Sequence, residues 1–311
     1  MNRNKDREFL KGLNPSAYKR VITERSKLAV VNVETGQLVE HYEPAPVFSD
    51  DQKHAIKDLS KLGMHHEEHG GFVSAFYEQS IPINDQLPEL TQSDYARLIY
   101  LATYTGYPER RNNFGYLRYD NQYYVTKDGL FDLLQMSRNK FDEFYKKVID
   151  CGILEETDAG KMIMNPFYFY RGNHAEIGGI IGDRQSIRVY RKTIRNLYKQ
   201  CNGRQIKQLG LIYAVLPFIN LKFNIIAHNP DEQDPKFVKP MKLGDLADKL
   251  GYAKISTLKS ALRSVRYGNK PVFQFVEDEA DNRMRKIIVN PAVIYGSNGE
   301  SLDAIKALFN D

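Results

Sequence analysis

The sequence predicts an α+β fold, mainly helical, in which two tandem copies of one domain follow an N-terminal β-hairpin arm. Three observations predict it. Short landmarks recur in one order, at offsets between 113 residues (Leu98 to Leu211) and 125 residues (Asn165 to Asn290). In each copy, patterns typical of helices are followed by two short patterns typical of strands. Residues 1–70 match neither copy.

The clearest landmark is the segment Lys161–Pro166, KMIMNP, which is echoed by KIIVNP at Lys286–Pro291. Three more pairs precede it in the same order: Phe72–Phe76 with Ile187–Tyr190, Leu98–Tyr100 with Leu211–Tyr213, and Leu130–Leu134 with Leu246–Leu250. Differences in loop length explain the drift in offset. We therefore expect an arm at 1–70, one domain at 71–175, a basic helix with a second domain at 176–300, and a tail at 301–311.

Each copy is expected to begin with two helices. The apolar residues of the first are Phe72, Phe76 and Tyr77 in copy one, and Val189, Ile194 and Leu197 in copy two. The second helix covers residues 95–102 or 209–219, and a short extended segment follows at 123–126 or 238–242. Apolar residues at helical spacing support both assignments.

A helix, a tight turn and another helix come next. Thr126 begins the first of these helices in copy one, and Ser137 suits the N-cap of the second, because its hydroxyl can accept from free backbone N–H groups. The turns fall at 135–137 and 251–253. Two strands joined by a polar loop complete each copy, at 152–155 with 161–164 and at 271–277 with 285–290. Helix–turn–helix followed by a hairpin is the winged helix-turn-helix arrangement.

The arm has a different composition. Residues 28–33 and 38–42 alternate apolar and polar side chains around Glu34–Gln37, which predicts a β-hairpin. Pro44, Pro46, Asp50 and Asp51 indicate a loop after it. Residues 1–27 hold eight basic and three acidic residues, so we expect a basic arm.

Composition narrows the function. The chain of 311 residues carries a net charge of +5, which is compatible with a nucleic-acid partner. Two cysteines, Cys151 and Cys201, are too few for a disulfide scaffold or a four-cysteine zinc site. No apolar stretch approaches the roughly 18 residues of a membrane span, and the N-terminus has no apolar signal region. We therefore expect a cytoplasmic protein without membrane contact.

Enzyme signatures are missing from the sequence. There is no phosphate-binding G-x-x-x-x-G-K-[ST] motif, no G-x-S-x-G nucleophile elbow and no dinucleotide-binding G-x-G-x-x-G that opens a helix. We expect no enzymatic activity, no catalytic residue and no cofactor. A binding protein is the favoured class.

The second helix of each helix–turn–helix pair predicts a DNA-reading surface. These helices are expected at 137–149 and 254–266, where Arg, Lys, Asn and Ser can reach base edges or phosphates in a major groove. Their apolar faces are Phe141, Phe144 and Val148 in copy one, and Ile255, Leu258, Leu262 and Val265 in copy two. The residues expected to contact DNA are Ser137, Arg138, Asn139, Lys140 and Lys146 in copy one, and Lys254, Ser256, Thr257, Lys259, Ser260, Arg263 and Arg266 in copy two.

Copy two is expected to make the stronger contact. It has no acidic residue between Lys249 and Lys270, whereas Asp142 and Glu143 lie among the basic residues of copy one. Acidic neighbours weaken the attraction of a helix for phosphates. The alternative interpretation is that both are ordinary solvated helix faces.

Two further basic segments are predicted to contact the DNA backbone. From Arg184 to Lys207 there are eight basic residues and no acid, and the spacing i, i+4, i+7 and i+11 predicts an arginine stripe on one helix face. Its residues are Arg184, Arg188, Arg191 and Arg195, with Lys192 beside them. Arg283 and Arg285, in the polar loop of copy two, are candidates for the minor groove, although four acidic residues precede them.

One cluster invites a metal interpretation. His65-His66-Glu67-Glu68-His69 holds three histidines and two carboxylates, but residue 66 is histidine where the H-E-x-x-H zinc motif needs glutamate. Glycines flank the cluster at 63, 70 and 71. We expect a polar loop and no metal site.

The first half resembles the winged-helix replication initiators of small Gram-positive plasmids and related phage winged-helix DNA-binding proteins. The residues that carry the resemblance are Glu34–Gly36, Gly71–Val73, Leu130–Leu134, Ser137–Phe141, Gly152–Ile153, Met164–Pro166 and Arg171–Gly172. It covers residues 27–173 in order, and 187–299 more loosely. It implies DNA binding and a part in replication initiation, and it brings no catalytic residues. Those initiators carry the module once, whereas this chain repeats it.

The sequence thus favours a non-enzymatic protein of a phage or plasmid that binds specific double-stranded DNA in replication initiation or transcription regulation. A second hypothesis is a module that binds a host polymerase or another replication or transcription protein through exposed aromatic residues. Those residues would be Tyr116, Tyr119, Tyr123 and Tyr124. A metal-dependent enzyme centred on His65–His69 is the least favoured hypothesis.

Overall fold

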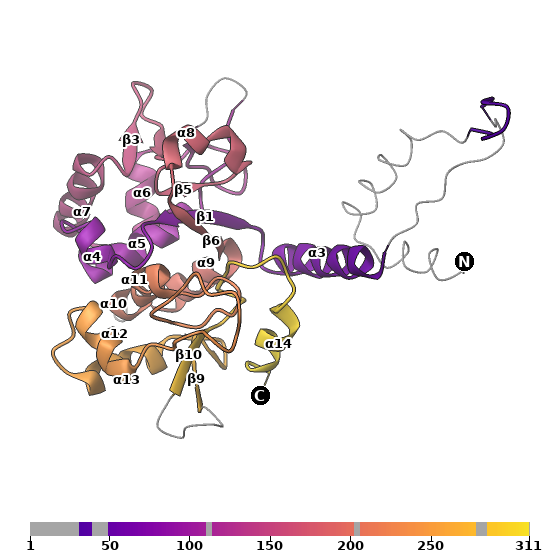
Figure 1. Ribbon diagram of the computed structural model, residues 1–311. Helices are drawn as coiled ribbons and strands as arrows, with labels where there is room; N and C mark the ends of the chain where they lie inside the picture. The colour runs from indigo at the N-terminus through magenta and orange to yellow at the C-terminus, as the bar shows by residue number, and fades with distance from the viewer. Residues whose placement is uncertain (1–30, 39–48, 110–113, 202–205, 278–284, 311) are drawn as a thin grey trace. The chain divides into compact units, whose positions relative to one another are not determined.

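The computed structural model describes residues 31–38, 49–109, 114–201, 206–277 and 285–310 (Figure 1). The chain divides into two compact units, Met1–Glu68 with Asn298–Leu302, and His69–Ser297 with Asp303–Asp311. Both expected domain copies fall in the second unit, apart from residues 298–300, which belong to the first. The helices and small antiparallel sheets confirm the α+β class. Among the described residues, every helix is too short or too polar to cross a membrane.

The first unit holds a turn and a long helix. Val31 and Leu38 form an antiparallel bridge around a turn at Gly36, which confirms the described part of the predicted hairpin. The basic segment 1–27 lies outside the described residues. Helix α3 runs from Asp50 to Glu68, so the prediction of loops at Asp50–Asp51 and at the histidine cluster was wrong. Negative charge in the first turn and histidine in the last both suit the helix dipole.

The sheet of the second unit reflects the internal repeat. It has the order β11-β6-β1-β5, with antiparallel pairing throughout. Its strands are β1 (Phe72–Tyr77), β5 (Phe169–Tyr170), β6 (Gln185–Tyr190) and β11 (Ile294–Tyr295). The first strand of each copy lies in the centre, and the last strand of the same copy lies beside it.

The prediction of a helix at Phe72–Tyr77 was therefore wrong, and the matching segment of copy two is also a strand up to Tyr190. Five of the six residues of β1 are buried, so the strand has apolar side chains on both faces and does not alternate. Such a run resembles part of a buried helix in sequence. Its aromatic and β-branched residues, and the two glycines before it, favour the strand.

The rest of copy one follows the predicted order. Helix α4 (Ile83–Gln86) precedes α5 (Gln92–Ala102), which begins with a capping box between Thr91 and Asp94. The helix–turn–helix pair is α6 (Lys127–Leu134) and α7 (Arg138–Asp150). Helix α6 begins after Thr126, as predicted, and the Thr126 hydroxyl accepts from the backbone N–H of Gly129. Ser137 occupies the predicted N-cap position of α7 but makes no side-chain hydrogen bond there. The strands β2 (Gly115–Tyr116), β4 (Met162–Met164) and β3 (Leu154–Glu156) form a small antiparallel sheet.

Copy two repeats this order with more irregular helices. After α9 (Arg191–Gln200), the predicted helix 209–219 is divided into α10 (Ile206–Leu209), α11 (Leu211–Ala214) and the 3-10 turn η2 (Leu216–Phe218). The helix–turn–helix pair is α12 (Leu243–Lys249) and α13 (Ile255–Ser264). The strands β7 (Arg266–Tyr267) and β8 (Lys270–Pro271) pair with each other, as do β9 (Phe273–Glu277) and β10 (Arg285–Val289). The short helices η1 (His174–Glu176) and α8 (Gly178–Ile181) join the copies, and α14 (Leu302–Ala307) lies in the predicted tail.

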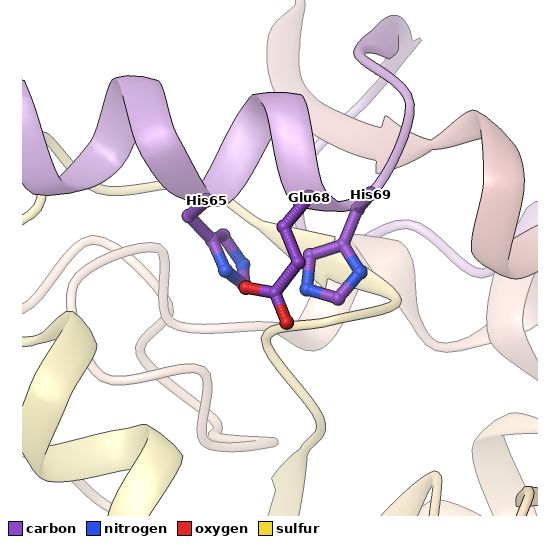
Figure 2. Close-up of side chains that lie close together, drawn as sticks. All are labelled: His65, Glu68 and His69. Atoms are coloured by element: carbon purple, nitrogen blue, oxygen red, sulfur yellow. The ribbon is translucent and has the colours of Figure 1, made fainter. Parts of the chain in front are cut away.

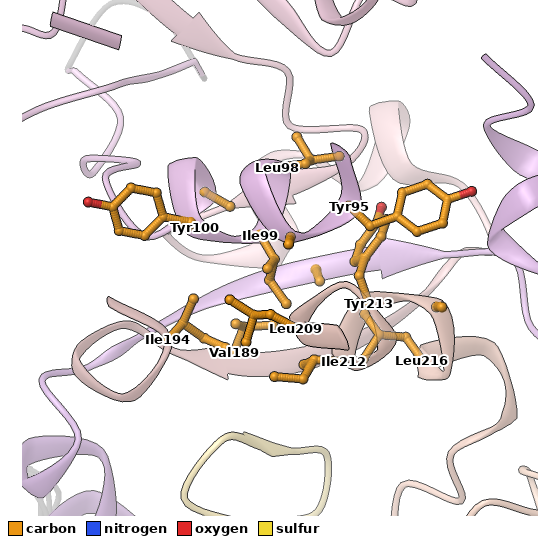
Figure 3. Close-up of a cluster of buried hydrophobic side chains, with 14 of the residues drawn as sticks. Tyr95, Leu98, Ile99, Tyr100, Val189, Ile194, Leu209, Ile212, Tyr213 and Leu216 are labelled. Carbon is orange, nitrogen blue, oxygen red and sulfur yellow. The ribbon is translucent and has the colours of Figure 1, made fainter. Parts of the chain in front are cut away.

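One apolar core runs through both copies. Helix α5 packs against α9, α10 and α11, and Figure 3 shows Ile99 of α5 pointing toward Val189 and Leu209 of copy two. Gly210 permits the close approach, because a Cβ atom there would lie 1.8 Å from the carbonyl oxygen of Gln92. The two copies therefore form a single packed body in which neither has a core of its own.

Candidate nucleic-acid interface

Helix α13 presents a basic surface that its own packing leaves exposed. Leu258 and Leu262 are buried, and the helix packs against α12 and β9. Ile255, predicted to be buried, is 52% exposed, because it is the first residue of the helix. Of the predicted contact residues, Lys259 is half-buried. The others are exposed: Lys254, Ser256, Thr257, Ser260, Arg263 and Arg266. Arg266 lies beyond the helix end, in β7.

Within the described part of the chain, the cations around α13 are in no ion pair. Lys254, Lys259, Arg263 and Arg266 form no ion pair with any carboxylate of the described residues. Arg263 lies 5.4 Å above the ring of Phe275, which holds the guanidinium group near the helix. The side chains of this surface therefore retain their charge for an outside anion.

Two lysines that the sequence reasoning left out extend this surface. Lys249, at the end of α12, and Lys270, in β8, are both exposed. They bound the acid-free stretch 249–270, which contains six basic residues. The sequence already indicated these two lysines, because they bound the stretch that lacks acidic residues. They were missed because only the predicted helix within that stretch was assigned to DNA contact. We name the exposed side of residues 249–270 the α13 surface.

The corresponding helix of copy one has a balanced charge. Phe141, Phe144 and Val148 form its buried face, as predicted. Arg138 pairs with Asp142, and Lys147 pairs with both Glu143 and Asp94. The predicted contact residues Ser137, Arg138, Asn139, Lys140 and Lys146 are all exposed. Of its cations, only Lys140 and Lys146 have no acidic partner among the described residues.

The arginine stripe does not exist as a helix face. Arg184 precedes β6 and Arg188 lies in it, whereas Arg191 and Arg195 lie in α9. The four guanidinium groups are bound inside the protein. Arg184 pairs with Glu78 and lies over the ring of Phe167, and Arg188 donates to the carbonyl oxygens of Gly296 and Ser297. The prediction of a helical stripe was wrong because the basic spacing spans a strand and the helix after it.

Arg195 illustrates how these arginines are used. It donates two hydrogen bonds of 2.8 and 2.9 Å to the carboxylate of Asp120, and two of 2.9 Å to the hydroxyl and carbonyl oxygens of Thr103. Its guanidinium group stacks 3.8 Å above the ring of Tyr104. Arg191 donates to the same carbonyl oxygen of Thr103. Burial, together with the neighbouring charges of Arg171 and Arg195, lowers the pKa of Arg191 to about 10. These arginines join α9 to copy one, and only Lys192 of this set is exposed.

The predicted minor-groove contact of copy two is only partly described. Arg283 lies outside the described residues, and Arg285 is placed in β10 by its backbone alone.

Of the four tyrosines expected to form an exposed aromatic surface, Tyr123 is 72% exposed. The other three are half-buried, and the rings of Tyr116 and Tyr124 pack edge to face. The predicted aromatic surface is therefore reduced to one ring.

The histidine cluster holds the one group of metal-ligand type found in the described residues. His65, Glu68 and His69 each offer a ligand atom, and these atoms lie within 4.8 Å of one another. Figure 2 shows the three side chains on one side of the helical turn. His65 and His69 are buried, and Nδ1 of His69 lies 3.3 Å from the hydroxyl of Thr193. Two ligands of one zinc ion are at most ~4.2 Å apart, so the group qualifies by residue type and proximity rather than by a formed coordination geometry.

The cysteines have the surroundings of inert thiols. Cys151 ends α7 and Cys201 ends α9. Burial raises the pKa of both thiols, so neither is activated as a thiolate.

No model of a known protein family, no curated protein and no solved structure matches this chain. Function must therefore be argued from the residues and their arrangement.

Proposed function

We propose that this protein binds double-stranded DNA without enzymatic chemistry, and that the α13 surface makes the main contact. In this proposal, both helix–turn–helix segments and their hairpins are winged helices. The resemblance to winged-helix replication initiators directs the proposal to an origin or operator of a plasmid or phage.

The single observation that carries the proposal is the unpaired charge of the α13 surface. Residues 249–270 contain six cations and no acid, and the described cations of α13 have no carboxylate partner. If these cations had a structural role, we would expect them to form ion pairs with carboxylates, as Arg184, Arg191 and Arg195 do. Exposed cations on one helix attract the phosphates of DNA and release counterions on binding.

The helix also carries groups that can read bases. Ser256 and Ser260 lie one turn apart, and Arg263 follows three residues later on the side away from the buried Leu258 and Leu262. A major groove admits one α-helix, in which arginine can bind guanine and serine can bind several bases. The combination favours a helix that combines backbone contact with base contact.

The direct test is a selection of bound fragments from a random pool of double-stranded DNA, at low and at physiological salt. The proposal predicts one recovered sequence motif at both concentrations. The variant Ser260→Ala with Arg263→Gln should lose the preference at part of that motif, and its affinity for the motif should fall more than its affinity for unrelated DNA, which loses one charge contact. If the selection recovers no motif and the protein releases all DNA at physiological salt, the proposal is contradicted and the protein-binding alternative is favoured.

A further inference from the structure

The main sheet of the second unit has two unlike faces. Val73, Ala75 and Tyr77 of β1 belong to the main core. Because side chains alternate along a strand, Phe72, Ser74 and Phe76 lie on the opposite face. There Ser74 is the direct cross-strand neighbour of Arg188. This second face therefore carries a serine and an arginine side by side at the centre of a sheet.

A cavity of about 350 Å³ lies on this second face. Its lining includes Phe72, Ser74, Asn173, His174, Ser186 and Arg188. The volume is within the range of small-molecule sites, roughly 300–1,000 Å³. One aromatic wall and several convergent polar groups are the composition expected of a site for a small polar ligand.

The polar groups of the cavity are held in place. Nε2 of His174 lies 2.8 Å from the hydroxyl oxygen of Ser74, and the imidazole packs edge to face against Phe76. Nη1 of Arg188 donates to the carbonyl oxygens of Ser297, at 2.8 Å, and Gly296, at 3.2 Å. These bonds use one nitrogen of the guanidinium group. Its other nitrogens keep donor capacity for a ligand.

The charge of Arg188 is not balanced by an ion pair within the described part of the chain. Unlike Arg184, Arg191 and Arg195, Arg188 forms no ion pair with a carboxylate of the described residues. Burial lowers the pKa of Arg188, as expected for a cation withdrawn from water. Burial and the charge of Arg188 also lower the pKa of His174, so its imidazole is neutral at pH 7. One positive charge therefore lies in a half-buried cavity lined by hydroxyl groups.

We propose that this cavity binds a small phosphate-bearing molecule, with the phosphate held by Arg188, Ser74 and Ser186. A guanidinium group matches the geometry of two phosphate oxygens, and the two hydroxyls supply donors for the others. His174 positions the hydroxyl of Ser74. The cavity exceeds the size of one phosphate ion, so a phosphate ester fits the space. The site is separate from the α13 surface and does not depend on DNA binding.

The test is calorimetric titration of the full chain with inorganic phosphate and with adenosine monophosphate, at constant ionic strength set by chloride. Saturable binding of one phosphate group per chain is expected. Binding of phosphate alone would identify the free ion as the ligand, and tighter binding of the nucleotide would identify an ester. Absence of saturable binding for both probes would overturn the proposal.

Three variants and one control locate the site. Arg188→Lys, Ser74→Ala and Ser186→Ala should each weaken binding, by on the order of tenfold or more for Arg188→Lys. Ser186→Ala removes a hydroxyl alone and keeps the test decisive if Arg188→Lys fails to fold. Lys192→Gln removes an exposed cation just beyond β6 and should change the affinity less than twofold. An equal loss in Lys192→Gln would show general charge attraction and overturn the site.

Discussion

Helices α7 and α13 occupy corresponding positions in the two copies, and they differ in how their charges are used. Each buries a narrow apolar face, Phe141, Phe144 and Val148 in α7 and Leu258 with Leu262 in α13. In α7, acidic side chains pair with Arg138 and Lys147. In α13 the sequence offers no acid at all. The comparison teaches that one fold position can serve mainly packing in one copy and remain available for an anion in the other.

The largest expected effect is the loss of DNA affinity when the α13 surface is neutralised. Lys254→Gln, Lys259→Gln and Arg263→Gln together should reduce affinity by on the order of 10²–10³-fold, because each removed phosphate contact weakens binding. The matched α7 variant, Arg138→Gln with Lys140→Gln and Lys146→Gln, should lose about tenfold or less. Fluorescence anisotropy with one selected duplex measures both.

These side chains are mostly exposed, so stability should change by less than ~0.5 kcal/mol in either triple variant. Thermal melting of both proteins provides the control. Equal losses of affinity in the two variants would contradict the assignment of the main contact to copy two.

Arg195 should behave in the opposite way. Arg195→Gln removes a guanidinium group that bonds Thr103 and stacks on Tyr104, and its side chain is 12% exposed. Asp120 is mostly exposed, so its ion pair contributes little, and the hydrogen bonds to Thr103 dominate. We expect a loss of about 1–3 kcal/mol in stability and unchanged DNA affinity of the folded protein. Chemical denaturation and anisotropy separate the two. A large loss of affinity with intact stability would restore the arginine as a DNA contact.

Removing the acids of α7 should make it resemble α13. Asp142→Asn with Glu143→Gln frees Arg138 from its ion pair, leaves Lys147 paired with Asp94 alone, and removes two negative charges. Affinity for DNA should rise by roughly 3–10-fold, with a steeper dependence on salt. An isosteric control, Asp150→Asn at the far end of α7, should have a smaller effect. Unchanged affinity in the double variant would place α7 away from the DNA.

The smallest effect concerns acid stability. The hydrogen bonds from Arg195 lower the pKa of Asp120 below that of the unfolded chain. The pair therefore stabilises the fold above the unfolded pKa, about 3.9, and loses its contribution as the pH falls through the lowered folded-state value. Asp120→Asn should lower the melting temperature by ~1–3 °C at pH 7. The difference from the unsubstituted protein should vanish in acid. A difference that persists there would exclude the carboxylate charge as its cause.

Sequence patterns predicted the helical parts best. The apolar spacing in α5 and α7 and the start of α6 at Thr126 depend on neighbours within one or two turns, and they were found. The strand at Phe72–Tyr77 was mistaken for a helix because its apolar run does not alternate, and its pairing partner β6 lies more than 100 residues away in the chain. The histidine cluster was taken for a loop because glycines flank it. Helix α3 nevertheless continues through Gly63.

The candidate site likewise has features that the sequence predicts and features that depend on distant residues. The basic character of α13 was readable, since charge and the absence of acids are properties of the sequence itself. The fate of Arg184, Arg188, Arg191 and Arg195 was not, because their partners Glu78, Gly296 and Thr103 are distant in the chain. The phosphate cavity was missed for the same reason, since Ser74 and His174 meet only through the sheet and the turn after β5.

The most direct test of the central claim is the salt dependence of DNA affinity for the unsubstituted chain and the two triple variants. Each phosphate contact contributes about 0.9 to the slope of log affinity against log salt concentration. The slope should fall by roughly two to three in the α13 variant and by one or less in the α7 variant. Slopes that fall equally in both, or in neither, would contradict the claim that the α13 surface holds the DNA.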